Sequence, residues 1–118
     1  MTGGLYNLTS DPATLSVSPA TIGTDETTQS TTPSTLREPP VFTDINTSMM
    51  ITNNCNAPLY LKFFETTPTG VVPSATDYDI IIPQQSVLSL PGTNGGIQVV
   101  SGASGSGKIR AVSWYVPA

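Results

Sequence analysis

The chain has 118 residues, a formal net charge of −4, 10% charged residues, 7% aromatic residues and no histidine. This length suits one small domain, and the 4 basic residues are too few to neutralise a run of nucleic-acid phosphates. No apolar stretch approaches the roughly 18 residues of a membrane-spanning helix. We therefore expect neither a nucleic-acid partner nor a membrane partner.

The N-terminal third is dominated by Thr, Ser and Pro, and residues 23–35 include no apolar residue. Such a segment buries too little hydrophobic surface to offset the entropy lost on ordering. We therefore predict an extended, low-complexity N-terminal arm over residues 1–40. The arm ends at Pro39-Pro40, which favours an extended chain, and a folded body follows over residues 41–118.

The predicted arm carries sparse apolar side chains that we expect to bind a partner, by filling small pockets or by adding strands to a sheet edge. These residues are Leu5, Tyr6, Leu8, Leu15, Val17, Ile22 and Leu36. Fully extended, the arm reaches at most ~130 Å at about 3.3 Å per residue, which is enough to cross a neighbouring subunit. The alternative is a flexible tail ordered only by its own domain.

From residue 41 onward, short apolar runs recur between turn-forming residues, a pattern typical of antiparallel strands. The predicted strands are residues 45–52, 59–65, 78–82, 87–90, 98–101 and 109–116. No window shows a sustained period of 3.6 residues, so we expect no helix. The predicted fold is all-β, a small antiparallel β-sandwich of jelly-roll or immunoglobulin-like type that follows the extended arm.

The two-residue alternation of these strands predicts a thin core. Its expected members are Phe42, Met49, Ile51, Leu59, Leu61, Phe63, Ile80, Ile82, Val87, Leu90, Ile97, Val99, Ile109, Val112 and Trp114. Open strand edges and modest burial favour self-association, for which we predict a homotrimer. The aromatic residues Tyr60, Phe64 and Tyr115 are the predicted subunit contacts, and alternation puts Trp114 and Tyr115 on opposite faces of their strand.

Residues 102–108 fit the first seven positions of the phosphate-binding pattern GxxxxGK[ST]. That site needs a hydroxyl residue after the lysine to hold magnesium and a helix that begins there. Here Ile109 occupies the hydroxyl position, and the residues after it read as a strand. We therefore predict a flexible hairpin loop rather than a nucleotide site.

The inventory of reactive side chains is small. Cys55 is the only cysteine, so it can form neither an intrachain disulfide nor a zinc site, and we expect a quiet thiol that is at least partly buried. Asp77 and Asp79 lack the further oxygen ligands of a calcium loop and read as solvated carboxylates at a strand end. Without histidine no Ser-His or Cys-His pair exists. We expect no catalytic residue, metal or cofactor, and thus no enzyme.

Residues 53–102 resemble a β-domain that recurs in virion proteins of tailed bacteriophages. The resemblance consists of an Asn-rich turn at 53–56, the strand LYLKFF at 59–64, a Pro/Gly loop at 68–73, a hairpin from Ile82-Pro83 to Leu90-Pro91, and a Ser/Gly-rich strand from Gly96-Ile97 to residue 102. It implies a non-enzymatic virion component, such as a capsid decoration or cement protein.

Such a protein is made in the host cytoplasm, which agrees with the lone cysteine, and lies on the outer capsid surface. The resemblance implies β-rich homotrimers that bind the major capsid protein, and N-terminal arms that clamp capsid subunits. The alternative is a tail, fibre or neck component. One such component would be a receptor- or glycan-binding module that uses exposed aromatic residues and the loops 92–96 and 102–108.

Overall fold

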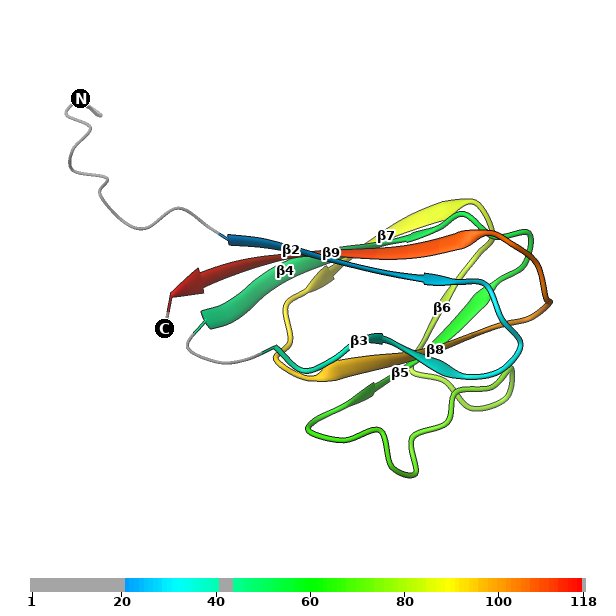
Figure 1. Ribbon diagram of the computed structural model, residues 1–118, viewed down its shortest axis with the longest axis horizontal. Helices are drawn as coiled ribbons and strands as arrows, with labels where there is room; N and C mark the ends of the chain where they lie inside the picture. The colour runs from blue at the N-terminus through cyan, green and yellow to red at the C-terminus, as the bar shows by residue number, and fades with distance from the viewer. Residues whose placement is uncertain (1–20, 41–43, 118) are drawn as a thin grey trace.

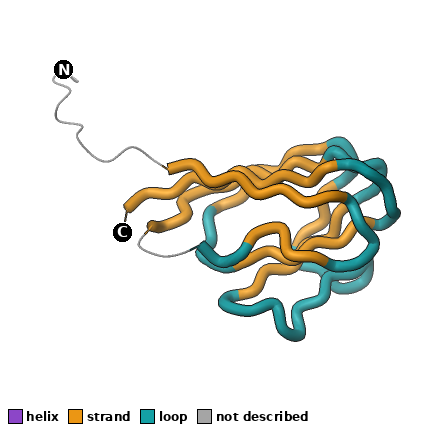
Figure 2. The backbone as a smooth tube through the Cα atoms, viewed as in Figure 1, coloured by secondary structure: helices purple, strands orange, loops and turns teal. Residues whose placement is uncertain are grey.

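The computed structural model describes residues 21–40 and 44–117. This part of the chain forms strands and loops without a helix (Figure 2), and therefore holds no helix that could cross a membrane. The strands are β2 (Thr21–Thr28), β3 (Ser34–Arg37), β4 (Asp44–Asn53), β5 (Leu59–Phe64), β6 (Ile80–Ile82), β7 (Ser86–Pro91), β8 (Gly96–Ser101) and β9 (Lys108–Pro117).

The strands form two antiparallel sheets that lie one above the other (Figure 1). One sheet has the order β2-β9-β4-β7, and the other has the order β3-β8-β5-β6. Each of the six predicted strands corresponds to one of β4 to β9, with ends shifted by no more than about two residues, the usual uncertainty of strand ends. The predicted all-β sandwich is confirmed.

The strand pairs are nested. Strand β2 pairs with β9, β3 with β8, β4 with β7, and β5 with β6. The chain is thus one long hairpin folded over itself, and the pairs β4–β9 and β5–β8 complete the two sheets. This arrangement of eight strands is a jelly roll. Its pairs join residues far apart in sequence, which is a topology that folds slowly.

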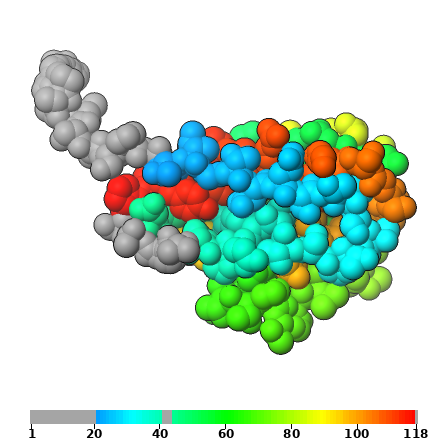
Figure 3. Space-filling view, in the orientation of Figure 1, coloured from blue at the N-terminus to red at the C-terminus, as the bar shows by residue number. Residues whose placement is uncertain are grey.

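The predicted boundary at residue 40 is wrong for residues 21–37. Strand β2 pairs with β9 along its whole length, from Thr21 opposite Tyr115 to Thr28 opposite Lys108, and β3 pairs with β8. Figure 3 shows the blue and cyan residues of this segment running along the side of the body. A strand pairs through its backbone, so this segment, whose apolar residues are only Ile22 and Leu36, was able to enter the sheets. Residues 1–20 of the predicted arm lie outside the described residues.

The core lies between the two sheets. Eight predicted core residues are buried in it: Met49, Ile51, Leu59, Leu61, Ile82, Ile97, Val99 and Ile109. Phe63, Ile80 and Leu90 are partly buried against them, and Leu36, Cys55 and Ala111 complete the cluster. The prediction that Cys55 is at least partly buried is confirmed, and burial raises the pKa of its thiol.

Three core predictions are wrong, and one lies outside the described residues. Val87 is 54% exposed on edge strand β7, because it lies three residues from the inward Leu90 and therefore on the opposite face. Val112 and Trp114 are half-buried and alternate with the inward Ala111 and Ser113 along β9. Phe42 is not among the described residues.

Candidate functional site

The outward side of the sheet β2-β9-β4-β7 carries apolar side chains in register. Residues directly opposite each other in an antiparallel pair point to the same side of the sheet. Trp114 lies opposite Ile22 on one side and Ser48 on the other, and Val112 lies between Thr24 and Met50. We call this side the outer face. Its apolar members are Ile22, Ile45, Met50, Val87, Pro91, Val112, Trp114 and Val116.

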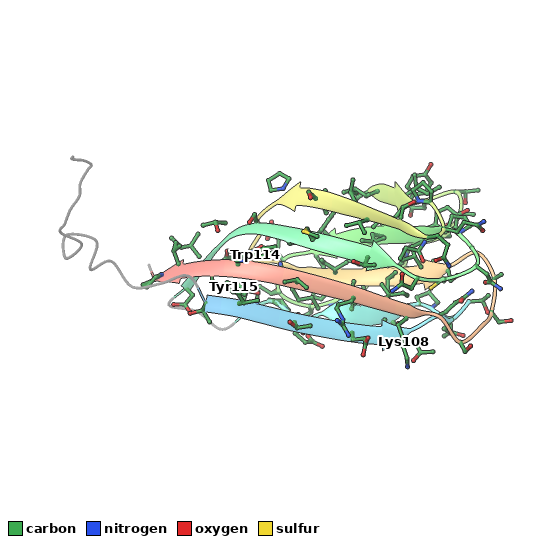
Figure 4. The ribbon with its side chains drawn as sticks, turned by 90° about the horizontal axis from the view of Figure 1, so that it is seen from above. Lys108, Trp114 and Tyr115 are labelled. Atoms are coloured by element: carbon green, nitrogen blue, oxygen red, sulfur yellow. The ribbon has the colours of Figure 1, made fainter. Side chains whose placement is uncertain are left out.

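Several of these side chains are open to solvent. Ile22 is 59% exposed, Ile45 is 48% exposed and Met50 is 36% exposed. Figure 4 looks down on this sheet, and its four strands face the viewer side by side. Sequence reasoning missed Ile45, Met50 and Val116 as surface residues. For Met50 the available signal was its alternation with buried Met49 and Ile51, but alternation alone does not say which side faces the core.

The charged groups of the outer face lie toward one end. Arg110 Nη2 is 3.3 Å from Glu26 Oε2, and Lys108 Nζ donates a hydrogen bond of 2.9 Å to Thr28 Oγ1. Figure 4 shows Lys108 at the opposite end of β9 from Trp114. Among the residues that the structure describes, the outer face therefore has no charged side chain at the end that carries Trp114.

Trp114 and Tyr115 lie on opposite sides of β9, as predicted, but their predicted environments are reversed. Trp114 belongs to the outer face, whereas Tyr115 shares the inward side with the fully buried Ser113. The Tyr115 ring packs on Gly23, where an added Cβ would lie 3.1 Å from Cε2 of the ring. Tyr115 also lines a cavity with Asp25 and Arg37. The predicted subunit contact thus points toward the interior of its own chain.

Arg37 joins the two sheets at the end where Trp114 and Tyr115 lie. Its side chain is 2% exposed, and Nη1 donates to Asn46 Oδ1 at 3.1 Å and to Ser113 Oγ at 3.2 Å. Nη2 donates to the carbonyl oxygens of Thr93 at 2.5 Å and Gly95 at 2.6 Å. A single guanidinium therefore holds the β7–β8 loop against β4 and β9.

The electrostatics of this cluster follow from its burial. Burial lowers the pKa of the Arg37 guanidinium, although neighbouring Tyr115 and Asp25 act in the opposite direction. Burial also raises the pKa of the Asp25 carboxyl, and Arg37 opposes that shift. The cavity beside them, of about 380 Å³, is also lined by Glu38 and Asp44. Both Nη atoms of Arg37 have protein partners, whereas its buried Nε has none among the described residues. The hydrogen bonds that Arg37 makes therefore position the β7–β8 loop.

The 102–108 loop connects β8 in one sheet to β9 in the other, so the prediction of a hairpin is wrong. The Gln29 side chain, 5% exposed, fills the inside of the loop. Its Nε2 donates to the Ala103 carbonyl at 2.9 Å, and its Oε1 accepts from the Gly107 amide at 3.3 Å. Lys108 begins a strand. The space that a phosphate would need is occupied by Gln29.

The loops 92–96 and 102–108 do not form a joint site. They flank β8 at its two ends, which places them about 17 Å apart at roughly 3.4 Å per residue. Asp77 and Asp79 also act separately. Asp77 Oδ1 is 2.8 Å from Lys62 Nζ, and Asp79 Oδ2 accepts a hydrogen bond of 2.9 Å from the Phe63 amide. The described residues hold no cluster of three side chains suited to a metal ion.

The predicted partner-binding residues fall into three groups. Leu36 is 4% exposed and Phe64 is 5% exposed, so both predictions are wrong, because these side chains are buried within their own chain. The Phe64 ring covers Gly96, where any Cβ would overlap it. Ile22 is exposed, and half-buried Tyr60 packs against Tyr78 with ring centroids 5.4 Å apart. The remaining anchors lie outside the described residues: Leu5, Tyr6, Leu8, Leu15 and Val17.

The solved structures that are similar to this chain include the following two. One comes from the structure described as "Bacillus endospore appendages form a novel family of disulfide-linked pili", with 16% sequence identity, a TM-score of 0.49, and coverage of 95% of this chain and 99% of that chain. The other comes from "Cyanophage Pam1 capsid asymmetric unit", with 11% identity, a TM-score of 0.44, and coverage of 98% and 97%. No family model matches the chain, and no curated protein matches it.

Proposed function

We propose that the chain is a non-enzymatic structural protein of a virion, and specifically a capsid decoration or cement protein. In this role it binds the major capsid protein on the outer capsid surface and associates with copies of itself. The exposed apolar outer face carries the proposal, since a face with Ile22 at 59% and Ile45 at 48% exposure is suited to an interaction with another protein.

Two further observations support an assembly role. Two buried polar side chains, Arg37 and Gln29, make hydrogen bonds within the chain. These bonds hold the 92–96 loop and the 102–108 loop in place. The jelly roll is a fold of viral capsid domains, although lectins and other proteins share it. The sequence resemblance of residues 53–102 to virion proteins of tailed phages supports the use of this fold in a virion rather than in a lectin.

The arm in this proposal is shorter than the sequence predicts. Residues 21–37 belong to the body, which leaves residues 1–20 to contact capsid subunits through Leu5, Tyr6, Leu8, Leu15 and Val17. Fully extended, this segment reaches at most ~66 Å at about 3.3 Å per residue. That exceeds the length of β9, which is about 34 Å at roughly 3.4 Å per residue, so the arm is long enough to pass beyond its own body.

A binding experiment tests the arm. Capsids that lack the protein are mixed with the full chain or with a variant that lacks residues 1–20, and the bound fraction is measured after sedimentation. We expect the variant to keep the circular dichroism spectrum of the full chain and to lose most of its binding. Undiminished binding by a folded variant would remove the arm from the mechanism.

The rival proposal is a receptor- or glycan-binding module at a tail, fibre or neck. The tilted pair Tyr60–Tyr78 favours it, because Tyr60 lines an open cavity of about 430 Å³ together with Val72, Pro73 and Ser74, and sugars stack on partly exposed aromatic rings. Binding to a glycan array that is lost in Tyr78→Ala and kept in Met50→Ala would favour this module over the decoration protein.

A further inference from the structure

We propose that the outer face of the sheet β2-β9-β4-β7 pairs with the same face of a second copy of this chain. The inference rests on the self-association in the proposed function and names the surface that carries it. An antiparallel sheet with one side in water normally places polar residues on that side. Here five of the nine outward positions of central strands β4 and β9 are apolar, namely Ile45, Met50, Val112, Trp114 and Val116, and the other four are Ser48, Thr52, Lys108 and Arg110.

The residues of this face are arranged as in a protein interface. One row across the four strands reads Ile22, Trp114, Ser48 and Pro91, and the next reads Thr24, Val112, Met50 and Ser89. In the second row the apolar pair lies on central strands β9 and β4, and hydroxyl residues lie on edge strands β2 and β7. The second row thus has an apolar centre between more polar edges, as interfaces have, whereas the first row has apolar Ile22 and Pro91 at its edges. Trp and Met are residue types that are enriched in interfaces.

The size of the face suits a stable pair. Strand β9 has 10 residues, or about 34 Å at roughly 3.4 Å per residue, and four strands at about 4.8 Å spacing are about 19 Å wide. Because edge strands β2 and β7 have only 8 and 6 residues, the face covers about 550 Å² at this spacing. Two such faces would bury about 1,100 Å² in total, just above the ~1,000 Å² expected of a specific interface. A smaller partner, such as a single peptide strand, would leave much of this area uncovered.

The charge of the face also favours a second copy. The chain has a net charge of −4, so the net charges of two copies repel each other. The outer face carries one acid, Glu26, and two bases, Arg110 and Lys108, and Glu26 is already paired with Arg110. Two copies thus approach through the part of the surface that is least acidic.

Face-to-face pairing has a defined geometry. Two sheets pack about 10 Å apart with their strands turned by about 30°, and a two-fold axis brings identical patches together. Such a pair contains two chains, in contrast to the homotrimer that the sequence resemblance implies. The mass of the particle in solution therefore distinguishes the two arrangements.

The test compares two isoleucines that are similarly exposed on opposite sheets. Ile45, 48% exposed, lies on the outer face, and Ile81, 42% exposed, lies on β6 of the other sheet. The full chain and the variants Ile45→Glu, Met50→Glu and Ile81→Glu are examined by sedimentation velocity and light scattering over a range of concentrations. Circular dichroism and urea unfolding establish that each variant is folded.

We expect the full chain and Ile81→Glu to have the mass of two chains, and Ile45→Glu and Met50→Glu to dissociate at least tenfold more readily. A monomeric full chain, a mass of three chains, or equal dissociation of Ile81→Glu and Ile45→Glu would overturn the pairing. Association that appears only after removal of residues 1–20 would also overturn it, because the chain's own N-terminal segment would then cover the face. Capsid binding is measured separately, so the proposed function can stand if the pairing fails.

Discussion

The substitution Leu36→Ala tests whether residues 34–37 are part of the folded body. Leu36 is 4% exposed and belongs to the core cluster between the sheets, where a Leu→Ala change costs about 2–5 kcal/mol. A domain of this size has a free energy of unfolding near the lower end of about 5–15 kcal/mol. The substitution should therefore remove a large part of the stability.

Ile22→Ala is the matched control, because Ile22 also lies in the segment that the sequence assigns to the arm but is 59% exposed. A substitution at such an exposed site changes the free energy of unfolding of a single chain by no more than about 0.5 kcal/mol. We take a loss of about 3 kcal/mol in the free energy of unfolding for Leu36→Ala, and a dependence of that free energy on urea of about 1.5 kcal/mol/M. In urea unfolding followed by circular dichroism, the midpoint of Leu36→Ala should then be lowered by ~2 M. Equal midpoints for the two variants would refute the placement of β3 in the core.

Three further predictions concern groups inside the body. Arg37→Met leaves two loop carbonyls without their donor and should lower the free energy of unfolding in urea by about 2–4 kcal/mol. The control Arg110→Met removes an exposed ion pair and should lower it by less than about 1 kcal/mol. Similar losses for both variants would contradict the role of Arg37 in fixing the loop. Burial raises the pKa of Asp25 in the folded state above its ordinary value of 3.8. This carboxyl therefore lowers the free energy of unfolding as the pH rises from 3.8 through the raised pKa. Asp25→Asn should therefore stabilise the chain at neutral pH but not at acidic pH, and thermal unfolding at both pH values checks this. Cys55, which is fully buried with a raised pKa, should react with maleimide only after unfolding, and rapid labelling of the folded protein would contradict its position.

The strands from β4 to β9 follow from the sequence because their apolar runs are bounded by turn residues. Leu59 and Leu61 point into the core as their alternation predicts. Strands β2 and β3 do not follow from the same reasoning, since Thr, Asp and Glu side chains give β2 no apolar pattern. The place of β2 in the sheet depends on its pairing with β9, 80 to 94 residues later in the chain, and local patterns do not contain that information.

The outer face was also hidden from sequence reasoning. In the run Met49-Met50-Ile51 apolar residues occupy both sides of β4, so alternation does not determine which side is buried. The register shift between Asn46 and Ser48 reverses the alternation at the start of the strand, so that Ile45 lies on the same side as Met50. Only the position of the second sheet shows that Met49 and Ile51 are inward and Met50 is outward.

The most direct test of the virion role is quantitative mass spectrometry of purified particles, calibrated against the major capsid protein. A decoration protein should be present at close to one copy per capsid subunit, or at another fixed ratio that corresponds to hundreds of copies per particle. A ratio of a few per cent would contradict the shell-wide role and move the protein to the neck or tail. Absence from the particles would contradict the virion assignment itself.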